Sequence, residues 1–143
     1  MSFEGSTLVD WSAYAKTRAE LGAGFVRILG YFREDGIKSV SAIEEAMRAR
    51  SATQLVIPAH TLKGESRQFG AEPLADLAET IENMARDCVE TRDAPDEILP
   101  HVVRLRGLFE ETLQLLEREA NPLAARRPPA GFGRRPGASF GQG

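Results

Sequence analysis

The chain has 143 residues, of which 42% are hydrophobic and 27% charged, so its length and composition predict a single soluble globular domain. Its one cysteine, Cys88, excludes an internal disulfide, and no apolar run approaches the ~18 residues that a membrane span needs. The N-terminus lacks the basic start and apolar run of a secretory signal, so we expect a cytoplasmic protein.

Charge is distributed unevenly along the chain. Residues 121–143 hold four arginines and no acidic residue, so residues 1–120 carry a net charge of −7 within the total of −3. An acidic domain argues against nucleic acid as a partner, because phosphate contacts need clustered basic residues. Residues 121–143 are rich in Arg, Pro and Gly with only isolated apolar residues, so they are predicted to be disordered.

A short helix is predicted at about residues 11–20, with Asp10 in the N-cap position. A longer helix follows at about residues 24–50, because apolar residues recur there at spacings near 3.6. This stripe passes through Gly36 in phase, which favours one helix, bent or closely packed at Gly36, over two helices. The stripe comprises Phe25, Ile28, Phe32, Gly36, Val40, Ile43 and Met47.

The third helix is predicted to begin at Ser51, which has capping-box spacing with Gln54. Pro58 lies inside the helical pattern, where proline removes one backbone hydrogen bond and bends a helix. We favour the interpretation that the helix starts late or kinks at Pro58. The alternative is that the backbone carbonyl near Gln54, left without its hydrogen bond, helps to set the direction of the His60 side chain. Gly70 is placed to end this helix as its C-cap.

The fourth helix is predicted around Pro73, which suits a first helical turn, and it carries an apolar seam. The seam comprises Leu74, Leu77, Ile81, Met84 and Cys88. Cys88 is thereby predicted to be a buried core thiol. After a loop at residues 91–95, the last helix spans about residues 96–120, and Asn121-Pro122 ends it. Its inward-facing residues are predicted to be Ile98, Val102, Leu105, Phe109, Thr112 and Leu116.

A short helix followed by four longer helices with short connections predicts an all-α fold. The expected architecture is an antiparallel up-down-up-down four-helix bundle over residues 1–120, with a short N-terminal helix. Residues 121–143 form the predicted disordered C-terminal tail. No strand pattern and no internal repeat is visible in the sequence.

The third helix carries a row of polar residues on the side away from its core face. The core face comprises Leu55, Ala59, Leu62, Ser66 and Phe69. His60 lies off this face, and Lys63, Gly64 and Arg67 follow it at three, four and seven residues, so they share its side of the helix. The exposed side therefore presents an imidazole, an ammonium, a bare backbone patch and a guanidinium.

This row resembles the histidine-containing phosphotransfer (HPt) family of two-component phosphorelays. The family signature is His, Lys-Gly three residues later, then an apolar residue, Gly and a small residue, matched here by His60, Lys63-Gly64 and Phe69-Gly70-Ala71. The resemblance covers roughly residues 8–120 in architecture and residues 59–74 in specific motif. It implies the same helical bundle that periodicity predicts.

The resemblance implies that His60 accepts a phosphoryl group from an aspartyl phosphate of one receiver domain and passes it to another. An unperturbed imidazole is largely neutral near pH 7 and keeps a free lone pair, and a phosphoramidate can return the group, whereas serine would trap it as an ester. Lys63, one turn away, can neutralise the phosphoryl oxygens. In the family the receiver supplies the aspartate and Mg²⁺, so no cofactor and no metal are expected in this chain.

The sequence departs from the family at residues 65–68, which read Glu-Ser-Arg-Gln where small residues with a Ser or Asn are usual. Gly64, Arg67 and Gln68 are predicted to meet the docking partner, and the bulky charged residues here are expected to influence specificity. Arg67 could add positive charge at the phosphoryl group. Gln68 is a candidate for orienting the ring of His60.

Other functions are weighed against the relay. An isolated helical histidine is usually an inert surface residue, and His101 is interpreted in that way or as structural. No nucleotide-binding motif is visible, so an autonomous enzyme is not expected. A phosphate-independent helical adaptor that docks a signalling partner is the main alternative. A helical metalloenzyme is disfavoured, because Glu97 and His101 form a single pair at the wrong spacing for a bundle metal centre.

Overall fold

The structure, a computed structural model, describes residues 7–120, so the predicted tail at 121–143 lies outside the described residues. The short helix is α1 (Trp11–Leu21), and the four longer helices are α2 (Phe25–Arg48), α3 (Ala52–Gln68), α4 (Glu72–Thr91) and α5 (Leu99–Ala120). Two short 3₁₀ segments, η1 (Gly22–Gly24) and η2 (Asp96–Ile98), precede α2 and α5. The five predicted helices are therefore confirmed.

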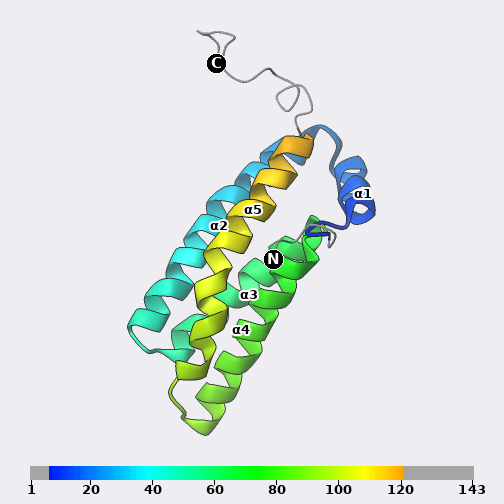
Figure 1. The fold of residues 1–143 in the computed structure, drawn as a ribbon. Helices are drawn as coiled ribbons and strands as arrows, with labels where there is room; N and C mark the ends of the chain where they lie inside the picture. Colours follow the sequence, from blue (N-terminus) through cyan, green and yellow to red (C-terminus); the bar gives the residue numbers. More distant parts are fainter. Residues whose placement is uncertain (1–6, 121–143) are drawn as a thin grey trace, which may run out of the picture.

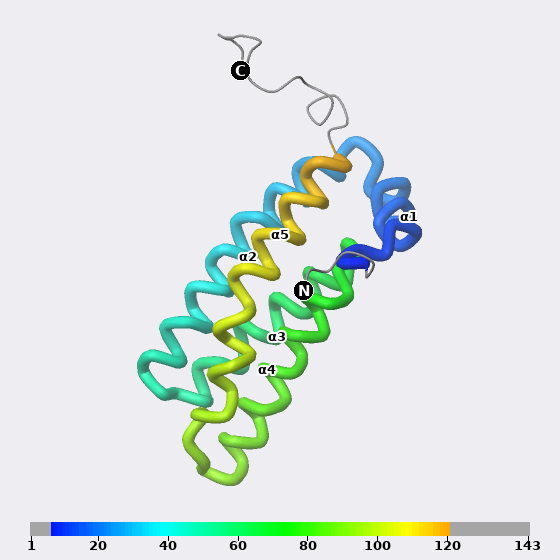
Figure 2. Tube along the Cα trace, in the orientation of Figure 1, coloured from blue at the N-terminus to red at the C-terminus, as the bar shows by residue number. Residues whose placement is uncertain are grey.

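Helices α2 to α5 form an antiparallel four-helix bundle, and α1 lies at the end of the bundle where α3 turns into α4 (Figures 1 and 2). Each of α3 and α5 packs against both α2 and α4, while no close backbone contact joins α3 to α5 within residues 7–120. The helices α3 and α5 therefore occupy opposite corners of the bundle. A side chain that points outward from α3 lies on the opposite side of the molecule from one that points outward from α5.

The starts of α1 and α3 are set by capping side chains, as the sequence predicted. The carboxylate of Asp10 accepts hydrogen bonds from the amides of Ser12 and Ala13, at 3.0 and 3.2 Å. The hydroxyl of Ser51 accepts from the amide of Gln54 at 3.2 Å, which satisfies a free amide in the first turn of α3. Of the two outcomes predicted at Pro58, a late start is wrong, since α3 begins at Ala52 and continues through the proline, whereas a kink stays a prediction.

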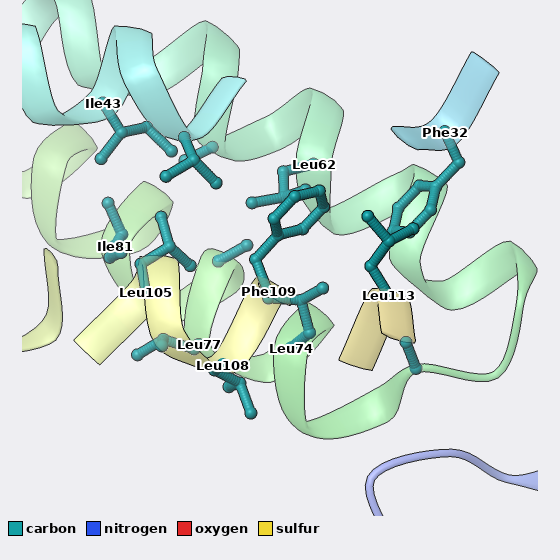
Figure 3. Close-up of a cluster of buried hydrophobic side chains, with 14 of the residues drawn as sticks. Phe32, Ile43, Leu62, Leu74, Leu77, Ile81, Leu105, Leu108, Phe109 and Leu113 are labelled. Atoms are coloured by element: carbon teal, nitrogen blue, oxygen red, sulfur yellow. The ribbon is translucent and has the colours of Figure 1, made fainter. Parts of the chain in front are cut away.

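The core is filled by aliphatic and aromatic side chains from all four helices of the bundle. Figure 3 shows Leu62 of α3, Leu74 of α4 and Phe109 of α5 converging in it. A Cβ on Gly36 would lie 2.3 Å from the ring of Phe109, so glycine lets α2 and α5 approach closely while α2 stays one helix. All six inward-facing residues predicted for the last helix are buried.

The seam predicted for the fourth helix is only partly correct. Leu74, Leu77 and Ile81 are buried, but Met84 and Cys88 are only partly buried, because they line a surface pocket beside the loop that follows α4. The Cys88 thiol contacts the carbonyl of Ala94 in the following loop, at 3.6 Å. The prediction of a fully buried core thiol is therefore wrong.

Candidate functional site

His60 lies near the middle of α3, and 58% of its side chain is exposed. Its ring faces α4, where Nδ1 lies 2.9 Å from Oε2 of Glu82. The rest of the ring is open to solvent. The helical phase that placed His60 away from the core is therefore in agreement with the structure, and the acid that holds the ring comes from the next helix.

Glu82 is the centre of a cluster of four side chains. Its side chain is only 4% exposed, and among residues 7–120 it is the one charged residue that is buried. Arg86, one turn further along α4, donates from Nε and Nη2 to Glu82 Oε2 at 3.0 and 2.8 Å. Lys63 Nζ lies 2.9 Å from Oε1 and forms an ion pair with it. Three groups from two helices thus converge on one carboxylate.

Opposing effects set the pKa of Glu82. Burial raises the pKa of this carboxyl, but the contacts with Lys63, then Arg86 and His60, outweigh burial and lower the pKa to about 2. Glu82 is therefore ionised at physiological pH and can only accept hydrogen bonds. In the neutral imidazole the proton must then sit on Nδ1 of His60, which leaves the lone pair on the outward-facing Nε2.

Lys63 is less exposed than its helical position alone predicts. Only 22% of its side chain is accessible, because the chain folds along α4 to reach Glu82. The ammonium and the ring of His60 therefore contact the same carboxylate from successive turns of α3. This brings together two of the predicted site residues.

Arg67 is directed away from His60. Its guanidinium contacts three carboxylates of α4, at 2.6 Å from Glu72, 3.3 Å from Asp76 and 2.9 Å from Glu79. The expectation that Arg67 adds positive charge beside His60 is not supported by this geometry, because the side chain is held by acids near the start of α4. Arg67 instead links the last turn of α3 to the first half of α4.

Gln68 does not orient the ring of His60, since the ring is held by the hydrogen bond that Nδ1–H donates to Glu82. Gln68 is the last residue of α3, and its main-chain carbonyl accepts a hydrogen bond from Thr17 Oγ1 at 2.7 Å. Its side chain is exposed. Gly64 is exposed as well, and a Cβ placed on it would meet no atom within 4 Å, so the backbone beside His60 is freely accessible.

Sequence reasoning missed Glu82 and Arg86, although the sequence holds a signal for Glu82. A second stripe runs along α4 beside the apolar seam and comprises Ala75, Ala78, Glu82 and Ala85, all buried. Small residues at spacings of three and four let a neighbouring helix approach closely. A lone acid on such a stripe is buried against that neighbour, so it must meet a cation or a hydrogen-bond donor there.

The bundle and this site together define a class of protein. A four-helix bundle here presents one histidine on an outer face of α3, with its ring held by Glu82 of α4 and with Lys63 one turn away. The chain matches the Hpt domain family over residues 27–121, more than half of its length, and it belongs to that family.

A solved structure has the same fold. The crystal structure of histidine-containing phosphotransfer protein B (HptB) from Pseudomonas aeruginosa PAO1 superposes with a TM-score of 0.71. The match covers 82% of this chain and 97% of the HptB chain, at 21% sequence identity. No curated protein matches the sequence.

Among residues 7–120 no group of three or more His, Cys, Asp or Glu side chains is arranged to hold a metal ion. No helix in that part of the chain is long and apolar enough to cross a membrane.

Proposed function

We propose that the protein relays a phosphoryl group between aspartates of receiver domains, with phospho-His60 as the intermediate. The observation that carries this proposal is the hydrogen bond from His60 Nδ1 to the ionised Glu82, at 2.9 Å. It fixes both the ring orientation and the tautomer, so that the nucleophilic lone pair of Nε2 faces outward. The receiver domains are those of response regulators and hybrid histidine kinases.

The transfer step follows from this geometry. The Nε2 lone pair attacks phosphorus of the aspartyl phosphate, an N–P bond forms, and the P–O bond to the aspartate breaks so that its carboxylate leaves. The ring becomes positively charged as the N–P bond forms, and the Glu82 carboxylate beside Nδ1–H stabilises that charge. In the reverse direction a second aspartate carboxylate attacks phosphorus, and the neutral ring leaves with its proton still on Nδ1.

Lys63 and Arg86 supply the positive charge for the phosphoryl oxygens. Both cations already contact Glu82, and Arg86 shares Oε2 with Nδ1 of His60, so its guanidinium lies beside the imidazole ring. The 54% exposed Arg86 side chain has room to turn toward a phosphoryl group. Arg86 thus takes the role that the sequence suggested for Arg67. Phosphoryl transfer depends on such positioning and charge neutralisation more than on covalent assistance.

The partner receiver domain supplies the other groups that the transfer needs. Mg²⁺ and the acyl phosphate belong to the receiver domain, so this chain needs no cofactor of its own and acts as an intermediate without autonomous catalysis. Neither nucleic acid nor membrane has a part in the reaction. A cytoplasmic location follows from the proposed partners.

The experiment is phosphoryl transfer from a panel of receiver domains of the same genome, each charged with labelled phosphate in the presence of Mg²⁺. We expect acid-labile, base-stable label on the wild-type chain and on His101→Gln, and none on His60→Gln. Label retained by His60→Gln would show that the acceptor is another residue. A chain that binds receivers but takes no label from any of them would favour the adaptor.

A further inference from the structure

The outward face of α5 has a stretch of bare backbone in its middle. Gly107 is exposed there, and a Cβ placed on it would meet no atom within 4 Å. Glycine destabilises a helix interior relative to alanine, and no packing within residues 7–120 requires it at this position. Another backbone can therefore approach α5 closely at Gly107, as it can approach α3 at Gly64.

Exposed apolar surface lies on both sides of this glycine along α5. Val103, one turn before Gly107, is 70% exposed, the largest exposed fraction among the large apolar side chains of residues 7–120. From Gly107 onward an open groove of about 610 Å³ runs between α2 and α5, and its apolar lining includes Ile37 and Leu113. We call this the α2–α5 groove. Val103 does not line it, so the valine and the groove are separate apolar features of one face.

Two opposite charges flank Gly107. Arg104 precedes it by three residues and Glu111 follows it by four, and both are exposed. At about 100° per residue, the two side chains project to the same side of Gly107, by about 60° and about 40°. All ion pairs that α5 forms within residues 7–120 involve Arg106 or Glu117, so Arg104 and Glu111 have no partner in that part of the chain.

This arrangement of charges is complementary to itself. When two copies of α5 pack antiparallel about a two-fold axis at Gly107, a residue before Gly107 in one copy meets a residue after it in the other, on the same side of the helix. Arg104 of each copy then meets the partner's Glu111. The contact therefore contains two ion pairs, and no pair of like charges results at these positions.

Val103 projects to the other side of Gly107, toward α2. Arg106 lies on that side too and pairs with Glu44 of α2 at 2.8 Å. In the same two-fold arrangement, Val103 of each copy reaches the level one turn after the partner's Gly107, where the α2–α5 groove lies. Burying the valine there removes apolar surface of both copies from water and favours association.

We propose that two copies of this chain form a two-fold dimer through α5, crossing at Gly107, with Val103 of each copy in the partner's α2–α5 groove and Arg104 of each paired with the partner's Glu111. Because α3 and α5 occupy opposite corners of the bundle, His60 of both copies faces away from the contact. A partner that is itself a dimer can then bind both copies at once, which strengthens binding without any new contact. The dimer neither requires nor excludes phosphoryl transfer at His60.

Sedimentation equilibrium of the full chain over a range of concentrations tests the dimer. We expect a reversible dimer with a dissociation constant of about 10–100 µM, because a single helix pair buries less surface than a permanent dimer. Gly107→Gln should raise this constant about tenfold, since its side chain holds the two helices apart. The matched control is Gly64→Gln, at an equally open glycine of α3, which should leave the constant within about twofold.

Charge reversal tests the antiparallel arrangement. Arg104→Glu and Glu111→Arg should each raise the dissociation constant about tenfold, because each places like charges opposite one another twice in the contact. In an equimolar mixture of the two variants both pairs become attractive, so a heterodimer should form at the wild-type concentration. The double variant should dimerise as well. All these positions are exposed, so melting temperatures should stay near wild type.

Several results would overturn the dimer. One is a chain that stays monomeric at about 1 mM, ten times the weakest dissociation constant expected. A dimer that survives Gly107→Gln, or that Gly64→Gln weakens equally, would place the contact on another face. A mixture of the two charge-reversed variants that stays monomeric would show that Arg104 does not meet the partner's Glu111. None of these results bears on the labelling of His60, which tests the relay separately.

Discussion

Two carboxylates on opposite flanks of α3 experience opposite environments. Glu82, on the α4 flank, has its pKa lowered to about 2 because the contacts with Lys63, Arg86 and His60 outweigh its burial. Glu65, at the interface with α2, has its pKa raised to about 7 by burial and by the neighbouring carboxyl of Asp35. One flank therefore stabilises negative charge and the other opposes it.

This difference in electrostatic environment gives the two flanks of α3 different roles. On the α4 flank the charges are paired within the chain, which fixes the reactive side chains before a partner arrives. On the α2 flank the Glu65 carboxyl is partly buried beside Asp35, and no ion pair to it is formed within residues 7–120, so a negative charge there is unfavourable. Changes on the α4 flank should therefore alter the chemical step, and changes at Glu65 on the α2 flank should alter stability.

The largest expected effect is that of Glu82→Ala. The ring of His60 loses the group that fixes its tautomer, and Lys63 and Arg86 lose their shared anchor. We expect the saturating rate of transfer to fall about 100-fold. Single-turnover transfer from a saturating receiver measures this rate, with Glu79→Ala as the matched control, since that acid pairs with Arg67 alone. Equal losses in both variants would mean that α4 acids act only on the fold.

Next in size are Lys63→Ala and Arg86→Ala, each expected to slow transfer about tenfold. Each change removes one charge-assisted contact with the phosphoryl group in the transition state, worth ~1.5–3 kcal/mol. Arg67→Ala should slow transfer less than twofold, although it removes ion pairs on the same helix. A larger loss in Arg67→Ala than in Arg86→Ala would restore the assignment that the sequence alone suggested.

Glu65→Gln should change the pH dependence of stability. Because the folded pKa of about 7 exceeds the ordinary 4.5, the folded state binds more protons between these values. The Glu65 contribution is fully present below pH 4.5 and is lost as pH rises through 7. We therefore expect Glu65→Gln to be more stable than wild type at pH 8, by about 1–2 kcal/mol.

Chemical denaturation of wild type and Glu65→Gln across pH 5 to pH 8 measures the effect, with Glu34→Gln, an exposed acid of α2, as the control. The difference between wild type and Glu65→Gln should shrink toward pH 5 as Glu65 takes up its proton. A difference that stays constant across this range would show that Glu65 is not protonated in the folded state.

The smallest expected effect is that of Gly64→Ala, which should stabilise the helix by ~0.5–1 kcal/mol. The added methyl meets no atom within 4 Å, so nothing opposes the gain in helix propensity. Gly64→Gln should also leave the fold intact, but it places a long side chain beside His60 and should slow transfer from a receiver. Melting curves and receiver-dependent labelling measure these effects. Wild-type transfer by Gly64→Gln would show that the receiver does not approach this part of α3.

Much of the fold could be predicted because it depends on local pattern. Apolar spacing placed the helices, and Ser51 and Asp10 marked two of their starts. The outward position of His60 followed from the same spacing. The continuous helix through Gly36 also followed, because the apolar stripe keeps its phase there.

The candidate site could be predicted only where its residues are close in sequence. Helical phase predicts the side of a helix from which a side chain projects. It does not predict the direction in which a long side chain then extends. Lys63 and Arg67 both extend toward α4, and their different acids were visible only once α4 was placed beside α3. Glu82 and Arg86 lie beyond the turn at Gly70, outside any motif that includes His60.

The attachment of α1 has a consequence for how the molecule unfolds. α1 precedes the part of the chain that matches the family, yet it is attached to one end of the bundle at two points, the α3–α4 turn and the last turns of α5. The Asp10 amide donates to the carbonyl of Gly70 at 2.7 Å, and the Tyr14 hydroxyl donates to the carbonyl of Leu116 at 3.1 Å. Amides of α1 should therefore exchange with deuterium in the same cooperative opening as those at the end of α5, and not by independent fraying.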